Sequence, residues 1–322
     1  MPRRIDISYK TIIFIATFIL GLWITLQILD LLLLLFVAVI LMSALSPVVV
    51  FFNRFKVPKA LGILITYIII ISVLAGVLAS FVPALIEQTN RLISALPPMV
   101  TEQLRINNLD QSIIQTELAQ GVRNVFSFAL TVFGNFVTLI FLLVVTFYLL
   151  LERERLEARI AALFIGQEER IKKLTFKIEE KLGAWLRGQL FLSIIIGCLT
   201  YIGLVILGLP YSLPLALLAA VMEVVPVIGP IIAAIPAILI ALTLSPALAA
   251  GVAAVYFVIQ QLENHLIVPQ VMKRAVGLNP LVVILAIAVG GRLLGITGAL
   301  LAVPFAVVLQ VIVSEVLHGK KD

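Results

Sequence analysis

The residues of this chain that could do chemistry are a few polar side chains inside long apolar runs. Glu223 is the clearest of them, because it lies three positions before Pro226 with no other charge nearby in the sequence. A charge at membrane depth is costly and usually faces a cavity or a partner. Glu223 is therefore predicted to accept a hydrogen bond from a solute or to hold a proton or cation. The alternative is a structural ion pair with Arg187 or Arg292.

A second polar group lies at the end of another apolar run, over residues 260–265. Gln260 and Asn264 are four positions apart, so they share a helix face. Asn264 is the better candidate for an amide that faces the solute. Glu263 and His265 fit an interfacial helix cap more simply than a binding site.

No catalytic constellation competes with a binding role. The two histidines, His265 and His318, are far apart, and neither a His-Glu-x-x-His motif, a P-loop nor a Gly-x-Ser-x-Gly motif is present. Cys198 is the single cysteine and sits inside an apolar run, which excludes an intrachain disulfide and a thiol metal site. Glu223 with Arg292 would make a poor acid–base pair for an intramembrane enzyme. We expect no enzymatic activity, no cofactor, no metal site and no ATP-driven pumping by this chain alone.

The elements that hold these residues are long apolar segments. Of the 322 residues, 62% are hydrophobic and only 12% are charged, and the mean hydropathy is +1.20. Soluble domains average about 45–50% apolar and about 25% charged residues, so this composition predicts an integral membrane protein. A helix needs about 20 apolar residues to cross a hydrocarbon core of about 30 Å. Runs near that size cover residues 11–29, 31–51, 59–82, 125–151, 189–209 and 247–268.

Two further apolar stretches are too long for one straight crossing. As single helices, 213–243 would extend about 46 Å and 280–317 about 57 Å. Each has helix breakers near its middle, where a proline removes an amide donor or glycines cluster. Paired Gly/Pro-interrupted segments are typical of broken helices that hold a solute near the bilayer midplane. We predict helical hairpins over 213–243 and 280–304. The alternatives are a single crossing and, for the glycines, close helix packing.

The residues predicted to bind the solute come from these two breaks and from the helix between them. Broken helix ends leave backbone groups unpaired, which is tolerable at membrane depth only where a solute, water or protein satisfies them. We predict an elevator-like movement of residues 190–310 against a frame formed by 11–82 and 171–187. The predicted binding residues are Glu223, Pro226, Gly229, Pro230, Gln260, Asn264, Gly291, Arg292, Gly295 and Gly298.

The net charge of +6 is spread over segments that flank the apolar runs, so it does not predict nucleic-acid binding. Basic residues concentrate at 53–58 and 152–187, whereas 83–123 has no basic excess. The positive-inside rule places the first two segments in the cytoplasm and the third outside. An outward-opening hairpin at 213–243 would also bring Lys273 and Arg274 to the cytoplasm.

Together these patterns predict an all-α polytopic integral membrane protein, including two re-entrant helical hairpins and an amphipathic interfacial helix. The apolar stripe and recurring lysines of 171–187 are typical of a helix in the headgroup layer. Five regions are predicted: N-terminal transmembrane scaffold helices at 1–82, an extracytoplasmic amphipathic segment at 83–123, a transmembrane helix plus the interfacial helix at 124–188, the transport region at 189–317, and a tail at 318–322.

The order of motifs along the chain resembles the autoinducer-2 exporter family. The likeness is strongest over 181–310 and weaker but collinear over 11–160. It is carried by Lys181-Leu182-Gly183, Arg187-Gly188-Gln189, Glu223-Val-Val-Pro226-Val-Ile-Gly229-Pro230 with Pro236, Gln260-Gln261-Leu262-Glu263-Asn264-His265 with Pro269, Gly277-Leu-Asn-Pro280, Gly290-Gly291, Gly295, Gly298 and Pro304.

The resemblance implies a multi-pass exporter of the bacterial inner membrane with about eight helical elements, in which two hairpins form the solute site. It also implies a homo-oligomer, for which a pentamer is the expectation. Family members have been linked to export of the quorum-sensing furanone autoinducer-2, and some relatives to sodium or lithium exchange for protons. The expected partners are therefore a small polar solute, membrane lipids and further copies of the chain. The alternatives are a monovalent cation/proton antiporter and a membrane scaffold without a cavity.

Overall fold

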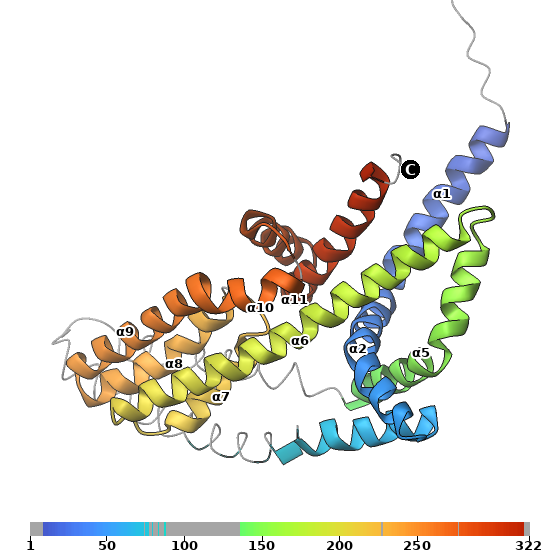
Figure 1. The fold of residues 1–322 in the computed structure, drawn as a ribbon. Coiled ribbons are helices and arrows are strands. Elements are labelled where there is room, and N and C mark those ends of the chain that lie inside the picture. Colours follow the sequence, from blue (N-terminus) through green and yellow to red (C-terminus); the bar gives the residue numbers. More distant parts are fainter. Residues whose placement is uncertain are drawn as a thin grey trace, which may run out of the picture.

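Every regular element in the described part of the chain is a helix. The computed structural model describes residues 9–73, 136–226, 228–275 and 277–318, and a few single positions between 75 and 87. The all-helical architecture of these residues confirms the predicted all-α class (Figure 1). The helices are α1 (Tyr9–Gln27), α2 (Leu29–Arg54), Lys59–Val73, α5 (Phe136–Ala162), α6 (Glu168–Ile206), α7 (Ser212–Met222), α8 (Ile228–Leu244), α9 (Pro246–Leu262), the π-helix η1 (Glu263–Ile267), α10 (Val268–Ala275) and α11 (Pro280–His318).

The described helices have the lengths and surfaces of a polytopic membrane protein. Five helical stretches are long and apolar enough to cross a membrane, and three shorter apolar helices accompany them. Large hydrophobic side chains are exposed along most of these helices, as expected of surfaces that face lipid. Nearly all of the predicted segment 83–123 and most of residues 74–82 lie outside the described residues. The five stretches are Tyr9–Gln27, Leu29–Arg54, Glu168–Ile206, Pro246–Met272 and Leu281–Leu317.

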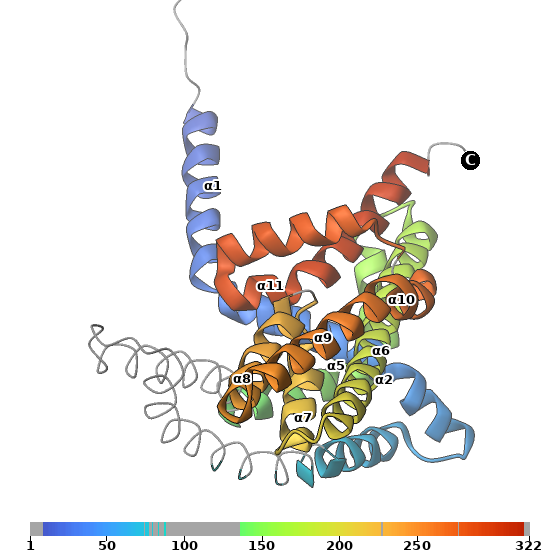
Figure 2. The same cartoon turned by 90° about the vertical axis from the view of Figure 1, so that its left-hand side faces the viewer.

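Helix α6 is the axis of the fold and differs from its sequence prediction. The segments 171–187 and 189–209 were expected to be an interfacial helix and a separate crossing, but they form one unbroken helix from Glu168 to Ile206. At 1.5 Å per residue its 39 residues span about 58 Å. Its charged N-terminal half packs against α2, α5 and α11, and α6 also contacts α7, α9 and α10 (Figures 1 and 2).

Helices α2 and α6 cross where a proline interrupts α2. Pro47 lies inside α2 and has no amide hydrogen, so the carbonyl of Ser43 loses its helical donor. Arg187 of α6 replaces that donor, because its Nη1 donates to the carbonyl oxygens of Ser43 at 3.3 Å and Ala44 at 3.2 Å. Gly183 allows the close approach, since a Cβ there would lie 2.3 Å from the Ser43 oxygen. The proline and its compensating arginine thus form one structural unit.

This pairing predicts a non-additive pair of substitutions. Arg187→Met leaves a carbonyl without a donor, which we expect to cost about 1–3 kcal/mol of unfolding free energy. In a Pro47→Ala background the amide of residue 47 can bond to the Ser43 carbonyl, so the same Arg187→Met change should cost less. Thermal unfolding of the four proteins in one detergent measures the difference. Equal costs in both backgrounds would contradict the assigned role of Arg187.

The stretch 213–243 is broken into the antiparallel pair α7 and α8. The described residues of the break are 223–226, just before Gly229 and Pro230, which lie in the first turn of α8. A Cβ on Gly229 would lie 1.8 Å from the carbonyl oxygen of Met222, so only glycine lets the chain turn this tightly. A core of α6, α7, α8 and α9 side chains, including Leu218, Ala237 and Val252, holds the pair together.

The stretch 280–317 is also broken, at Leu294 and Gly295, which have non-helical backbone angles inside α11. The two arms cross closely, because a Cβ on Gly290 would lie 2.4 Å from the Gly298 oxygen and one on Gly298 would lie 2.0 Å from the Gly290 oxygen. Figure 2 shows the chain reversing within α11. The two sequence interpretations of these glycines, a hairpin and close helix packing, therefore both apply.

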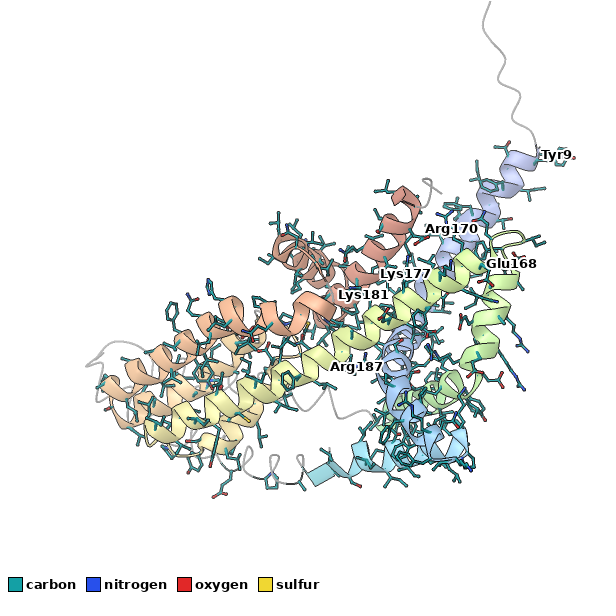
Figure 3. All side chains as sticks on the ribbon, viewed as in Figure 1. Tyr9, Glu168, Arg170, Lys177, Lys181 and Arg187 are labelled. Carbon is teal, nitrogen blue, oxygen red and sulfur yellow. The ribbon has the colours of Figure 1, made fainter. Side chains whose placement is uncertain are left out.

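Ion pairs tie the charged half of α6 to its neighbours. Glu315 near the end of α11 accepts from Lys177 at 2.9 Å and lies 3.6 Å from Arg170. Arg153 of α5 donates to Glu179 at 2.6 Å and to Ser46 of α2 at 2.8 Å. Figure 3 shows Arg170 and Lys177 along this half of α6. The charges of 168–187 thus serve packing between helices as well as any contact with headgroups.

Candidate functional site

Glu223 is buried at the break between α7 and α8. Only 1% of its surface is exposed, and its Oε2 has no hydrogen-bond partner in the described structure. Its backbone carbonyl, in contrast, accepts a hydrogen bond of 2.6 Å from the Nε2 of Gln189 on α6. The backbone at the break is therefore satisfied by protein, while the carboxyl group is left without a partner.

Glu263 is a second buried carboxyl group. It is 3% exposed and lies at the junction of α9 and η1. Gln260 donates from Nε2 to its Oε2 at 3.1 Å. Glu223 and Glu263 follow the last residues of α7 and α9, and both of these helices pack against α6. The described structure thus holds a pair of buried carboxyl groups on elements that adjoin α6.

The described basic residues do not neutralise this pair. Arg187 is bonded to the α2 backbone, and Arg292 is exposed near the α11 break. Within the described structure neither arginine is in an ion pair with Glu223. The structural ion pair considered from the sequence therefore does not form, and the pair carries uncompensated acidic charge whenever it is deprotonated.

Further polar atoms are buried along the two helices that flank the pair. Ser193 lies four residues after Gln189 on α6, and Thr200 lies seven residues after Ser193. Both hydroxyls lack a hydrogen-bond partner in the described structure. Tyr256, one heptad before Glu263 on α9, also has a buried hydroxyl without a partner. Each such group favours a bound water, proton or ligand, because unsatisfied buried polar atoms are costly.

The structure reverses the expected roles of the residues at the end of α9. Asn264 is exposed and Gln260 is half-buried, whereas Glu263 is buried. The π-helix η1 begins at Glu263, and its wider turn changes which residues share a face. Glu263 is the residue that caps α9, but its burial places it inside the protein, and the solute-facing roles of Gln260 and Asn264 stay predictions.

The buried positions of Glu263 and Gln189 had a signal in the sequence. Val252, Tyr256, Ile259 and Glu263 recur at helical spacing and all four are buried. The same spacing places Gln189 within the α6 stripe of Leu182, Trp185, Leu192 and Ile196. A polar residue inside a helical apolar stripe marks a buried polar site. Gln189 was missed because only polar residues near the breaks were considered.

The remaining predicted residues divide between the two breaks. At the first break Pro226 is half-buried and Gly229 and Pro230 are buried. In α11 Gly298 is buried, Gly291 is half-buried, and Gly295 and Arg292 are exposed. The glycines with tight contacts to backbone serve the packing of the hairpins, and Arg292 and Gly295 do not join the carboxyl pair.

A buried apolar cluster includes residues of both broken segments. Val225, in the α7–α8 break, belongs to the same cluster as Ile287, Ala299 and Val303 of α11. These α11 residues come from both arms of the hairpin. Leu182 and Trp185 of α6 are members of the same cluster, so both broken segments share one core with α6.

The polar groups of this site have the chemistry to bind a small charged or polar species. No group of three or more His, Cys, Asp or Glu side chains that could hold a metal ion occurs among the residues described. A pair of buried carboxyls beside amide and hydroxyl groups can take up and release a proton or a monovalent cation.

Comparison with known proteins places this geometry in a context of transport. A family model described as "AI-2E family transporter" matches residues 12–318. "Putative transport protein YrrI" of Bacillus subtilis (strain 168) is 29% identical over 314 residues, covering 89% of this chain and 87% of that protein. "Putative transport protein YueF" of the same strain is also 29% identical, over 85% of this chain and 81% of its own length. "Putative permease PerM" of Escherichia coli (strain K12) is 30% identical over 65% of this chain.

Proposed function

This chain belongs to the AI-2E transporter family, and from that premise we propose that it exports a small polar solute by a gradient-driven mechanism. The solute would bind beside the α7–α8 break, within reach of Glu223 and the half-buried Gln260. A molecule such as the quorum-sensing furanone autoinducer-2, which carries several hydroxyl groups, has the hydrogen-bonding chemistry for this site. We place the protein in the bacterial inner membrane as a multi-pass transporter without enzymatic activity.

The observation that carries the proposal is the buried, partnerless carboxyl of Glu223 at a helix break. A purely structural break would be expected to satisfy its polar side chain or to use an apolar residue. Here the backbone is satisfied by Gln189 while the carboxyl Oε2 is not. A buried carboxyl oxygen without a hydrogen-bond partner at membrane depth supports a role for Glu223 in binding.

A second candidate, monovalent cation/proton antiport, is favoured by the dryness of the same pair. Glu223 and Glu263 are only 1% and 3% exposed. A titrating carboxylate that exchanges sodium or lithium for a proton requires such surroundings. The two candidates share one site and differ in what displaces the proton.

We further propose that α7 to α11 move as the mobile part against α2 and α5. The boundary differs from the one expected between residues 187 and 190, because α6 is continuous there and contacts both groups of helices. Movement therefore requires α6 to bend or to pivot. Assembly into a homo-oligomer, with five copies as the expectation, would use the N-terminal helices, since none of α1 is buried within one chain.

Flux measurements with purified protein in liposomes test the function. We expect radiolabelled autoinducer-2 or another small polyol to accumulate only when a pH or sodium gradient is imposed. Lithium or sodium flux that responds to a pH gradient, without movement of the organic solute, would favour antiport instead. No flux of either kind above protein-free liposomes would contradict both candidates. Sealed liposomes loaded with a pH-sensitive dye report proton movement in the same samples.

A further inference from the structure

We propose that the turn between α5 and α6, residues 163–167, inserts into the headgroup layer of an anionic lipid surface. Three consecutive apolar side chains, Leu163, Phe164 and Ile165, enter the layer, and the cations of Arg159 and Lys173 bind lipid phosphate groups. The turn lies at the opposite end of α6 from the buried carboxyl groups, so this inference does not depend on the proposed function.

The first observation is the exposure of the apolar side chains at the turn. Leu163, Phe164 and Ile165 are 79%, 49% and 91% exposed, and Ile160, in the last turn of α5, is 42% exposed. A contiguous apolar patch that is open to water indicates a contact with a membrane or with another protein. Some further surface is therefore expected to cover this turn.

Contact with the bilayer core along a membrane crossing does not explain this exposure. Charged residues separate the turn from the apolar runs on both sides. They make up six of the eight residues 152–159 and nine of the fourteen residues 168–181. Charges at that density are too costly for the hydrocarbon core. The turn therefore lies beyond the crossings, and its apolar side chains need a separate explanation.

The turn is ordered and directs these side chains outward. Gly166 has a φ of +82°, which glycine adopts without strain, and its amide donates to the Oε1 of Glu168 at 3.0 Å. The amide of Gln167 donates to the carbonyl oxygen of Phe164 at 2.9 Å. Backbone groups that are already paired cost less to remove from water, and a preformed turn loses less entropy on binding.

The charges around the turn favour an anionic surface. Residues 159–173 include four basic and two acidic residues. Both acids have partners close by, since Glu168 accepts from the turn and Glu169 lies 3.5 Å from Lys172. Arg159 and Lys173 are exposed and have no ion-pair partner in the described structure. Two cations on either side of an apolar tip are therefore open to phosphate groups.

The same mixture of apolar and basic residues continues along α6. Phe176, three positions after Lys173 and hence a neighbour on the helix surface, is 54% exposed. Exposed apolar side chains among lysines and arginines are typical of segments at a membrane interface. Lysine is depleted in interfaces between proteins. The composition of this surface therefore favours lipid over a soluble protein partner.

The turn also lies at the end of the molecule where a membrane is expected. Figures 1 and 2 show the α5–α6 turn and the start of α1 at the same end of the molecule, and Figure 3 shows Tyr9 and Glu168 there. Helix α1 has the length and hydropathy of a membrane crossing. The positive-inside rule predicts a cytoplasmic position for 152–187, and the cytoplasmic leaflet has an anionic surface.

Fluorescence of a dye at the turn, measured on the full chain in lipid nanodiscs, tests the inference. Cys198 is the single cysteine, so Cys198→Ala provides a background in which Ile165→Cys holds one environment-sensitive dye. We expect its emission to shift to shorter wavelength, and to be quenched by nitroxide lipids, in nanodiscs that contain phosphatidylglycerol but not in phosphatidylcholine alone. A dye at Glu154→Cys, on the exposed face of α5, should stay open to aqueous iodide in both lipids.

Charge variants separate the contribution of the cations from that of the apolar tip. Arg159→Gln and Lys173→Gln should each raise the phosphatidylglycerol fraction needed for half of the shift roughly fivefold. The matched control is Lys56→Gln, an exposed cation of another loop, which should leave that fraction unchanged. Leu163→Ser with Phe164→Ser should weaken the shift while the dye stays at position 165.

Three outcomes would overturn the inference. A dye at position 165 that iodide still reaches in phosphatidylglycerol nanodiscs would exclude insertion and favour a soluble partner. An equal shift in both lipids would show that anionic headgroups are not recognised. A shift that responds to neither charge variant would remove the role of Arg159 and Lys173. Thermal unfolding of each variant verifies that these changes of exposed side chains have kept the fold.

Discussion

Gly298→Ala is expected to abolish transport. A Cβ at this position would lie 2.0 Å from the carbonyl oxygen of Gly290 and 2.6 Å from its carbonyl carbon. Neither atom belongs to a flexible side chain, so the two arms of α11 must move apart. Overpacking of a tight contact typically costs 1–3 kcal/mol, and a cost of about 3 kcal/mol corresponds to roughly a hundredfold change in population. Flux through reconstituted protein measures the loss.

The same hairpin offers a matched control. At Gly291 an added Cβ would meet only the Cβ of Ala299 at 3.8 Å, which is an ordinary contact. Alanine also has a better helix propensity than glycine, by about 1 kcal/mol. Gly291→Ala should therefore keep flux and thermal stability close to those of the unsubstituted protein. Similar losses of flux in both variants would show that disruption of the Gly290–Gly298 crossing does not cause the loss of flux in Gly298→Ala.

The breaks in the fold could be predicted because length and residue type both demanded them. A straight helix over 213–243 or 280–317 exceeds the hydrocarbon thickness, and prolines or glycines lie near each midpoint. The observed breaks lie a few residues away from the predicted ones. In the first stretch α7 ends at Met222 and the break begins at Glu223, because Gly229 packs tightly on the Met222 backbone and is already part of the returning helix.

The continuity of α6 could not be predicted in the same way. The change from the charged segment 171–187 to the apolar run 189–209 suggested two helices in different environments. Tertiary contacts decide otherwise. Arg187 repairs the α2 backbone, and Glu315 and Glu179 bind the basic residues of α6, so the charged half is held among other helices. Contacts with residues that are distant in the sequence produce no periodic pattern in the sequence of α6 itself.

The candidate site was predicted in part for a comparable reason. Glu223 stood out as an isolated charge in an apolar segment, and that feature is local. The hydrogen bond between Gln189 and the Glu223 backbone joins two segments separated by tens of residues, and single-sequence patterns do not pair such positions. The π-helix at Glu263 also depends on the local packing of α9 and α10, which the apparent four-residue spacing of Gln260 and Asn264 conceals.

Replacing both buried carboxyls with methionine is expected to stop transport and to stabilise the protein at the same time. Glu223→Met with Glu263→Met keeps the side chains long and unbranched but removes two buried carboxyl groups. Burying a polar group without a hydrogen bond costs about 1–3 kcal/mol in proteins, and apolar replacements of buried ionic groups are often stabilising. The thermal unfolding midpoint should rise by several degrees, while proton-coupled flux falls to the level of protein-free liposomes.

Gln189→Met provides a control of opposite sign at the same site. It has nearly the same shape, but it removes the amide that donates to the Glu223 backbone carbonyl at 2.6 Å. An orphaned buried carbonyl destabilises, so the unfolding midpoint of this variant should fall. A site kept for structure would lose stability in both variants. A gain in the double methionine variant with a loss in Gln189→Met would show that the carboxyls are retained at the expense of stability, which is the behaviour of functional groups. A lower midpoint in the double methionine variant would contradict the functional assignment of the pair.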